Sequence, residues 1–300
     1  MLLATLSLAA QTPKEEYQRR YNQLVQRVGL SGLGVETLLQ HWEADYPDDT
    51  DMLEAKFGCF FQKSASPKVI QLSQDRYLGR EPLIPYTDST GVKQNYFEDT
   101  EYDDELFSTA TQALDKAISL SPKRLDYRLA KVSALTAYEK ESPDMAMQSL
   151  KGLIDYHYAT KPEWVYPGIE KVDGDTFNAL IQEHCFTFFK IGSPQSQEAF
   201  RALSETMLQF NPDEPLFLDN IGSYYLVCKG DSKKALKYYN KVLKKHPDDL
   251  TAIQNCIILA RKEKNLKLEK KYLPMMIKYA PEEKDRTSAE MRLRSISGKK

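Results

Sequence analysis

The sequence predicts an all-α protein built of antiparallel helix pairs, and three observations lead to this prediction. Pro212, Pro247 and Pro281 lie 35 and 34 residues apart, which is the length of one helix pair. Each proline ends a stretch whose apolar residues recur with the period of one helix face. The chain of 300 residues is 41% hydrophobic and 28% charged with 13 Gly, which is typical of a folded helical protein.

The clearest pair lies in residues 215–248. Its second helix places a small residue, two apolar residues and a final proline at offsets of zero, four, seven and twelve: Ala235, Tyr239, Val242 and Pro247. Its first helix carries a matching stripe: Leu218, Ile221, Gly222 and Tyr225. Gly222 predicts a place where two helices approach too closely for a β-carbon.

This pair resembles a tetratricopeptide repeat, which has Gly-Asp in the turn between its helices, as at Gly230-Asp231. The resemblance implies a right-handed α-solenoid of antiparallel helix pairs whose first helices line a concave groove. One departure is visible, because Gly222 and Gly230 are eight residues apart where the family has seven. We therefore expect one extra residue in the first helix, near Val227 and Cys228.

Other copies of the spacing end at Pro47, Pro122, Pro212 and Pro281. An acidic pair follows Pro47 and Pro247 and can cap the next helix. Pro274 should kink or split its helix, and the last helix is charged enough to act as a solvent-facing cap. The predicted helices are 14–28, 33–46, 51–63, 103–120, 124–140, 143–157, 174–191, 195–210, 215–229, 232–246, 249–263, 266–279 and 283–296.

Two segments interrupt the array, at 64–100 and 156–175. In the first, two extended arms around a turn ending in Gly91 predict a β-hairpin near 82–97. The second contains Trp164 and Tyr166 between turn residues. These aromatics either form a functional loop or fill a gap between helix pairs, and we favour the second interpretation. Exposure of Trp164 would favour the first.

The first ten residues are mostly apolar and resemble a truncated signal peptide that lacks its basic start. The alternative is a plain helical turn or tag. Residues 11–300 are expected to form a single array. The first interpretation predicts export to the periplasm, and the second predicts a cytoplasmic protein. No segment approaches the ~20 apolar residues of a membrane-spanning helix. A similarity to a group of exported bacterial tetratricopeptide proteins rests on the apolar leader ending at Gln11 and on residues 42–49, 102–107 and 124–128. It implies a fold and export but no activity.

No motif predicts a catalytic residue, a cofactor or a metal site. The cysteines lie apart, at Cys59, Cys185, Cys228 and Cys256, without a metal-ligand spacing or a readable disulfide pattern. His184 and Cys185 are adjacent on a predicted helix, so their side chains diverge and cannot form a nucleophile and base. The acidic run at 99–105 lacks the pattern of a calcium loop and is interpreted as a solvated helix start.

The family resemblance places partner-binding positions on the first helices of two successive pairs, and the aromatic loop adds two more candidates. These residues are Asp219, Ser223, Gln254, Ile258, Arg261, Trp164 and Tyr166. A row of lysines from Lys233 to Lys245 is interpreted as the solvated back of a helix rather than a docking surface. The net charge of −2 gives no footprint for nucleic acid.

The predicted function is a scaffold or adaptor that binds a protein or peptide in the concave groove. One alternative is a structural protein that self-associates. Another is an enzyme whose site is built by the two interruptions, which would require converging carboxylates or a histidine with a perturbed pKa.

Overall fold

The computed structural model describes residues 13–298, which form two compact units. Unit 1 contains residues 13–138 and Pro162–Val172, and unit 2 contains Glu139–Lys161 and residues 173–298. Residues 1–10, which resemble a truncated signal peptide, lie outside the described part of the chain.

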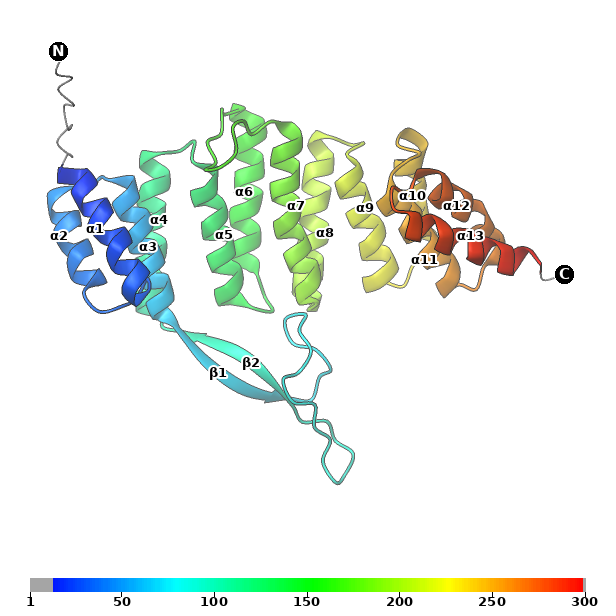
Figure 1. Cartoon of the computed structure of the whole chain (residues 1–300), viewed down its shortest axis with the longest axis horizontal. Helices are drawn as coiled ribbons and strands as arrows, with labels where there is room; N and C mark the ends of the chain where they lie inside the picture. Colours follow the sequence, from blue (N-terminus) through cyan, green and yellow to red (C-terminus); the bar gives the residue numbers. More distant parts are fainter. Residues whose placement is uncertain (1–12, 299–300) are drawn as a thin grey trace, which may run out of the picture. The chain divides into compact units, whose positions relative to one another are not determined.

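Unit 1 consists of helices and one β-hairpin (Figure 1). Its elements are α1 (Pro13–Val28), α2 (Val35–Asp45), α3 (Thr50–Ser64), β1 (Ala65–Leu72), β2 (Asn95–Tyr102), α4 (Asp104–Leu120) and α5 (Leu125–Glu139), the last residue of which belongs to unit 2. Its core gathers apolar side chains of α2, α3 and α4 around Trp42. The Trp42 indole donates a 3.0 Å hydrogen bond to Asp49, which also caps α3 by accepting from the Asp51 amide. The acidic pair after Pro47 therefore supplies a helix cap, as predicted.

Unit 2 consists of helices. They are α6 (Asp144–Thr160), α7 (Gly174–Ile191), α8 (Pro194–Phe210), α9 (Pro215–Ser223), the π-helical turn η1 (Tyr224–Cys228), α10 (Ser232–Lys245), α11 (Leu250–Lys262), α12 (Leu266–Tyr279) and α13 (Glu283–Ser297). Neighbouring helices pack in sequence order from α7 to α13. Asp249 caps α11 through the Ala252 amide at 2.8 Å, repeating the role of Asp49.

The predicted all-α fold of tetratricopeptide-like antiparallel helix pairs is confirmed, and the predicted helix bounds agree with the observed ones to within a few residues. Two details differ. The helix predicted at 143–157 continues to Thr160, so the aromatic loop begins later than expected. The second difference concerns α12, which runs through Pro274 as one helix, so the predicted split does not occur.

The extra residue expected near Val227 and Cys228 is accommodated by η1. The Lys229 amide bonds to the Tyr224 carbonyl five residues earlier, at 3.2 Å, where an α-helix would use the residue four earlier. The widened turn absorbs one residue without breaking the helix. Just before it, a β-carbon on Gly222 would lie 2.4 Å from the Tyr239 ring, so the predicted close approach of α9 and α10 is confirmed.

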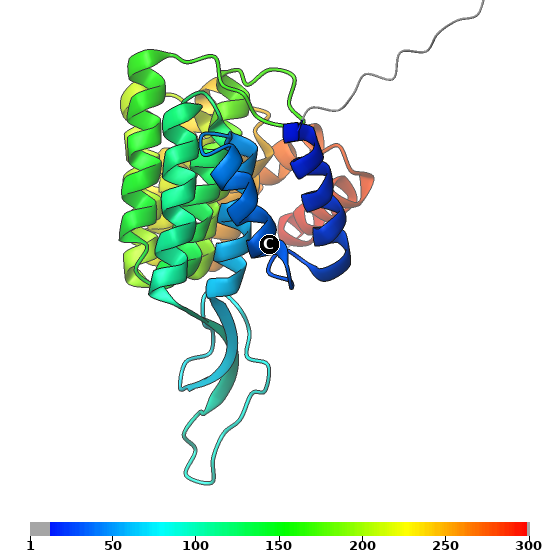
Figure 2. The ribbon, with the colours of Figure 1, turned by 90° about the vertical axis from the view of Figure 1, so that its left-hand side faces the viewer.

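The predicted β-hairpin exists, but its main pairing lies outside 82–97. β1 and β2 are antiparallel, with Ala65 opposite Tyr102 and Leu72 opposite Asn95. The expected inner arms pair only through bridges at Ile84–Tyr96 and Thr87–Lys93. The sequence did not predict β1 because its exposed residues do not alternate with buried ones. In both views the hairpin projects from the ends of α3 and α4 (Figures 1 and 2).

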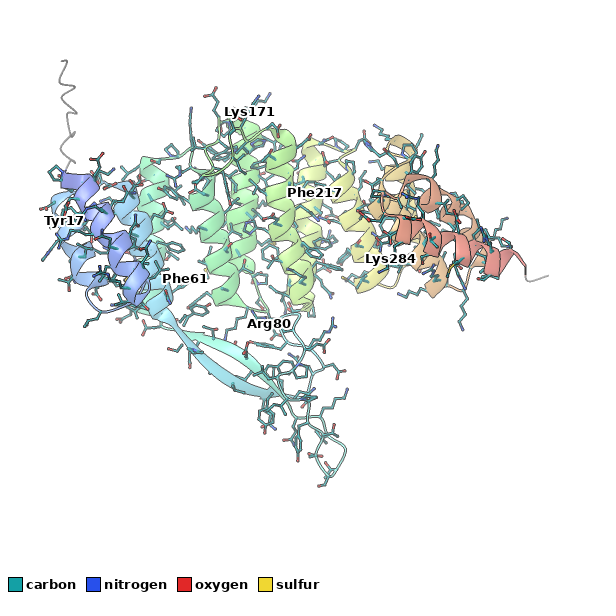
Figure 3. All side chains as sticks on the ribbon, in the orientation of Figure 1. Tyr17, Phe61, Arg80, Lys171, Phe217 and Lys284 are labelled. Carbon is teal, nitrogen blue, oxygen red and sulfur yellow. The ribbon has the colours of Figure 1, made fainter. Side chains whose placement is uncertain are left out.

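Stacked aromatic side chains join this hairpin to the helices of unit 1. Phe61, at its base in Figure 3, stacks on Tyr102 with ring centroids 5.8 Å apart. Phe107 stacks on Tyr138 at 4.1 Å. These rings bury apolar surface where α3 passes into β1 and β2 into α4.

Candidate functional site: a groove on the last three helices of unit 2

A groove of about 250 Å³ lies among α11, α12 and α13. Three of the predicted partner-binding residues line it together: Gln254, Ile258 and Arg261. Its other lining residues are Leu250, Ile257, Leu273, Met276, Ala280, Asp285, Ser288 and Ala289. Lys284 marks the first turn of α13 beside this region in Figure 3.

The helical period explains how α11 contributes to the groove. Leu250, Gln254, Ile258 and Arg261 follow one another at intervals of four, four and three residues and so share one face of the helix. Ile258 leaves 47% of its surface exposed, although it is a large apolar residue. Ile257 and Leu273 are buried and belong to the core. The groove thus combines an apolar floor and an exposed apolar side chain with polar groups at its edge.

The edge of the groove is fixed by an ion-pair network around Glu269 of α12. Glu269 is only 1% exposed, and its carboxylate accepts 2.8 Å and 2.7 Å hydrogen bonds from the Nε atoms of Arg261 and Arg292. Arg292 adds a second bond of 2.8 Å and is the main reason that the pKa of Glu269 is lowered. The network ties α11 and α13 to α12 and holds the Arg261 guanidinium beside the groove.

The structure places Asp219 and Ser223 away from this groove. Asp219 is only 6% exposed, so its side chain cannot contact a partner in this conformation, and its prediction as a groove residue is corrected. Burial, together with the nearby Asp249, raises the pKa of Asp219 to about 8. Ser223 is partly buried and shares a 3.2 Å hydrogen bond with the Tyr239 hydroxyl. The π-turn and the close α9–α10 packing direct this helix face inward.

The two candidate residues of the aromatic loop of unit 1, Trp164 and Tyr166, differ in how far they are exposed. Trp164 is 6% exposed, and the Arg128 guanidinium lies 5.7 Å from the centre of its ring. Backbone hydrogen bonds of Val165 with Lys123 and Leu125 hold the loop against the start of α5. Tyr166 is partly exposed. The burial of Trp164 agrees with the interpretation that this residue fills space.

Burial keeps the adjacent His184 and Cys185 side chains uncharged near neutral pH. Burial raises the pKa of the Cys185 thiol to about 12 and lowers that of His184 to about 4, so neither a thiolate nor an imidazolium forms there near neutral pH. Within residues 13–298, no three His, Cys, Asp or Glu side chains are grouped closely enough to hold a metal ion. In the acidic run, Asp103 caps α4 through the Leu106 amide, as the solvated-helix-start interpretation expects.

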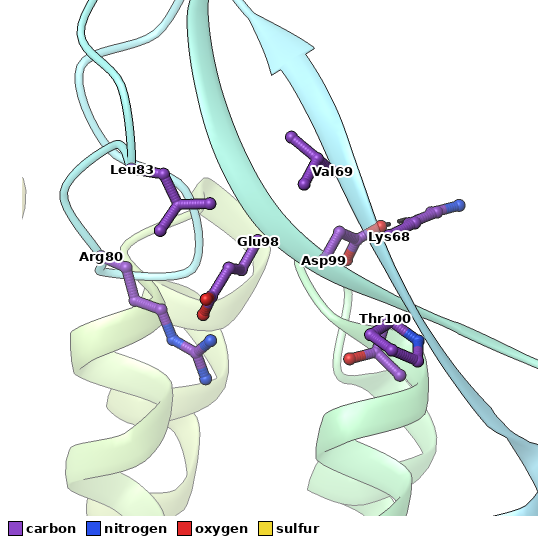
Figure 4. Close-up of a pocket in the computed structure, with 8 residues that line it drawn as sticks. Lys68, Val69, Arg80, Leu83, Glu98, Asp99 and Thr100 are labelled. Atoms are coloured by element: carbon purple, nitrogen blue, oxygen red, sulfur yellow. Dashed lines mark ion pairs between the residues drawn. The ribbon is translucent and has the colours of Figure 1, made fainter.

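A second cavity, of about 560 Å³, lies on the hairpin of unit 1 and was not predicted (Figure 4). It is lined by Pro67, Lys68, Val69, Arg80, Leu83, Glu98, Asp99 and Thr100. Asp99 is buried, accepts a 3.1 Å hydrogen bond from Tyr77 and pairs with Lys68 at 3.7 Å. The Arg80 and Glu98 side chains extend to the same side of the cavity in Figure 4. The sequence missed this site because it depends on strand register rather than on a local motif.

Comparisons with known proteins give limited guidance. No family model matches the chain, and no curated protein matches it. Among solved structures, PilW, described as a widely conserved type IV pilus biogenesis factor, aligns at 10% identity over 94% of this chain and 100% of its own, with a TM-score of 0.39. Pseudomonas aeruginosa pilF aligns at 11% identity over 94% and 100% of the two chains, with a TM-score of 0.38.

A third structure, the flexible tandem repeat domain from a component of bacterial cellulose synthase, aligns at 14% identity over 96% of this chain and 99% of its own, with a TM-score of 0.30. Because all three scores are low, the fold assignment rests on the helix pairs of this chain itself. In the described part of the chain, none of the helices is both long and apolar enough to cross a membrane.

Proposed function

We propose that this protein is a scaffold or adaptor that binds an extended peptide segment of another protein in the α11–α13 groove. The observation that carries the proposal is the exposed Ile258 side chain, which lies in a groove with a buried apolar floor. A peptide residue that enters the groove would cover Ile258 and gain the free energy of apolar burial. Most binding energy at such interfaces comes from a few central apolar contacts of this kind.

The polar edge of the groove can orient the peptide. Gln254 offers both a donor and an acceptor for the peptide backbone. The Arg261 side chain is 48% exposed although its guanidinium is paired with Glu269. The guanidinium can therefore still contact a peptide carbonyl or carboxylate. Asp285 in the first turn of α13 can accept from a peptide N–H group or a basic side chain.

A displayed library of random peptides, selected on the full chain, tests the proposal. Peptides that bind the groove should lose at least about tenfold in affinity with Ile258→Asp, because a carboxylate in the apolar groove must be desolvated. Met291→Asp is the matched control, since Met291 is also well exposed, on α13, but does not line the groove. Selection of no peptide, or equal affinity for both variants, would contradict the proposal.

Export to the periplasm remains part of this proposal, on the basis of the apolar residues 1–10. The mass of the protein recovered from periplasmic and cytoplasmic fractions of a bacterial host tests it. A periplasmic product that begins near Gln11 would support export and cleavage. A cytoplasmic product that retains residues 1–10 would contradict both.

The two other functions considered from the sequence differ in their support. The enzymatic alternative requires converging carboxylates or a histidine with a perturbed pKa. Burial lowers the pKa of His184 to about 4, but the adjacent Cys185 is fully buried and stays a thiol, so this pair offers no nucleophile. The self-association alternative is supported by a specific feature of the β-hairpin, the open edge of its first strand.

A further inference from the structure

In the part of the chain that the structure describes, no strand lies beside the outer edge of β1. β1 pairs with β2 along one edge, and no bridge within residues 13–298 involves its other edge. β2 differs, because near Tyr96 its outer edge is occupied by the segment around Ile84. A free strand edge exposes backbone donors and acceptors that can pair with another strand.

The hydrogen bonds on either side of the hairpin show which residues of β1 face outward. The Asp103 amide donates to the Ser64 carbonyl at 2.9 Å, so the even-numbered residues of β1 direct their backbone groups toward β2. Tyr96, opposite Gln71, directs its own groups away from β1: its amide donates to Ile84 at 3.0 Å and its carbonyl accepts from Leu83 at 2.8 Å. Pro67, Val69 and Gln71 therefore point their backbone groups out of the sheet.

Pro67 fits this assignment, because a proline costs no ladder hydrogen bond where its nitrogen faces away from the neighbouring strand. Two amides remain on the free edge, those of Val69 and Gln71. The edge also carries an apolar side chain, since Val69 is 61% exposed. The one charged side chain of β1, Lys68, is already paired with Asp99 and Glu101.

We propose that β1 pairs with β1 of a second copy of this chain, antiparallel, about a two-fold axis at Ile70. In this register Val69 of each copy lies opposite Gln71 of the other, which forms four backbone hydrogen bonds. Ile70 faces its own copy across the axis, and Lys68 lies opposite Leu72. The two Pro67 residues fall beyond the paired centre.

The edge is complementary to a second copy of itself, because each copy offers the amides and carbonyls of the same two residues, Val69 and Gln71. Isologous pairing of this kind closes into a dimer and uses the free edge of β1 in both copies. A register shifted toward Pro67 would place the two Lys68 residues opposite each other and would lose amide donors, so it is disfavoured. The interface is small, and we expect a dissociation constant of about 10–100 μM.

Amide hydrogen exchange on the full chain tests the proposal at the level of single residues. Lys68 and Ile70 amides bond within the hairpin and should be protected at every protein concentration. Val69 and Gln71 amides should exchange freely in dilute protein and become at least about tenfold slower above the dissociation constant. Sedimentation velocity over the same range should show a monomer converting to a dimer.

Substitutions at Val69 separate edge pairing from other contacts. Val69→Pro removes an outward amide while leaving the β2 ladder complete, and it should weaken dimerisation at least tenfold. Val69→Thr keeps the amide and the strand preference, and it should stay within about threefold of the unchanged protein. Retained protection of Lys68 and Ile70 in Val69→Pro shows that the hairpin is folded. If that protection is lost, Val69→Lys is used in place of Val69→Pro. Val69→Lys keeps the amide but adds charge to the edge, and it should also weaken dimerisation.

The proposal is overturned by any of three results. The first is a monomer at concentrations about tenfold above the expected dissociation constant. The second is a dimer in which Val69 and Gln71 stay unprotected, which would place the contact elsewhere. The third is dimerisation unaffected by the edge-blocking substitution in a folded hairpin. None of these results bears on peptide binding in the α11–α13 groove.

Discussion

The helix pair α9–α10 and the β-hairpin differ in where they place their apolar residues. In α9–α10, Leu218, Ala235, Tyr239 and Val242 are buried against one another and against α11. In the hairpin, Val69, Leu83, Ile84 and Val92 are all exposed. The repeat buries these residues between neighbouring helices, whereas the hairpin buries Tyr77 and Phe97 but leaves these four aliphatic residues on its surface.

This difference shows that the regular and irregular parts of the chain have different physical roles. A helix pair satisfies its own backbone groups and is specified by side-chain fit. A two-stranded hairpin leaves one edge of each strand open and depends on added partners. Changes in the repeat should therefore alter global stability, while changes in the hairpin should have local or intermolecular effects. Four substitutions test that contrast, in order of decreasing effect.

Gly222→Ala should cause the largest loss of stability, about 3 kcal/mol, because the added β-carbon would lie 2.4 Å from the buried Tyr239 ring. Urea denaturation measures the change. Gly152→Ala in α6 is the matched control: a β-carbon there meets nothing within 4 Å, so this helix position should gain up to about 1 kcal/mol. Equal effects at the two glycines would show that α9 and α10 are not tightly packed.

Asp219→Asn should stabilise unit 2 by about 2 kcal/mol at pH 8. The unfolded carboxyl ionises near pH 4, whereas burial keeps the folded one protonated up to about pH 8. The folded protein therefore holds an extra proton between these values, and its free energy of unfolding falls as the pH rises through that window. Asparagine copies the neutral form and removes this fall. Denaturation at several pH values should show a difference between the two proteins that is near zero at pH 4 and grows to its largest value at pH 8.

Glu269→Gln should cost about 1–2 kcal/mol at pH 7, less than for a fully buried pair because Arg261 and Arg292 stay partly exposed. The lowered pKa of Glu269 means that its contribution is present above the unfolded value near pH 4 and is lost as the pH falls through the folded value. Thermal denaturation from pH 7 downward should show the two proteins converging in acid. A constant difference at all pH values would exclude the ion pairs as its cause.

Asp88→Ala should have the smallest effect and should act only at the tip of the hairpin. The Asp88 carboxylate accepts hydrogen bonds from the Thr90 hydroxyl at 2.6 Å, the Val92 amide at 3.0 Å and the Thr90 amide at 2.9 Å, and these lower its pKa to about 2. Amide exchange at Thr90 and Val92 should become faster without a change in the melting temperature. Asp88→Asn, which keeps one acceptor oxygen, should lie between the two proteins.

The sequence predicted the helical array well because each helix carries local signals. Proline ends, acidic caps and apolar stripes fixed the helices to within a few residues, and the spacing of Gly222 and Gly230 located the π-turn. Glu269 is a residue whose burial and ion pairs could have been predicted from the repeat spacing. It stands where the best repeat has Ala235, and a charge at a packed position requires partners, which Arg261 and Arg292 supply.

The candidate sites were predicted less completely. Gln254, Ile258 and Arg261 meet in one groove, whereas Asp219 is buried. The helical period alone does not show which face of a helix is exposed when the helix packs against neighbours on both sides. The α12 and α13 side chains of the groove come from elsewhere in the chain and carry no motif. Similarly, the free edge of β1 depends on its register with β2, which follows it after a long connection, and β1 itself has no alternating pattern.

Local sequence was enough to specify the helix pairs, their ends and their caps, since these depend on interactions within a few residues of each other. Long-range packing settled which polar residues are buried, which helices share a groove and which strand edge is left open. These properties depend on contacts between residues far apart in the chain, and small changes of helix face or strand register reverse them.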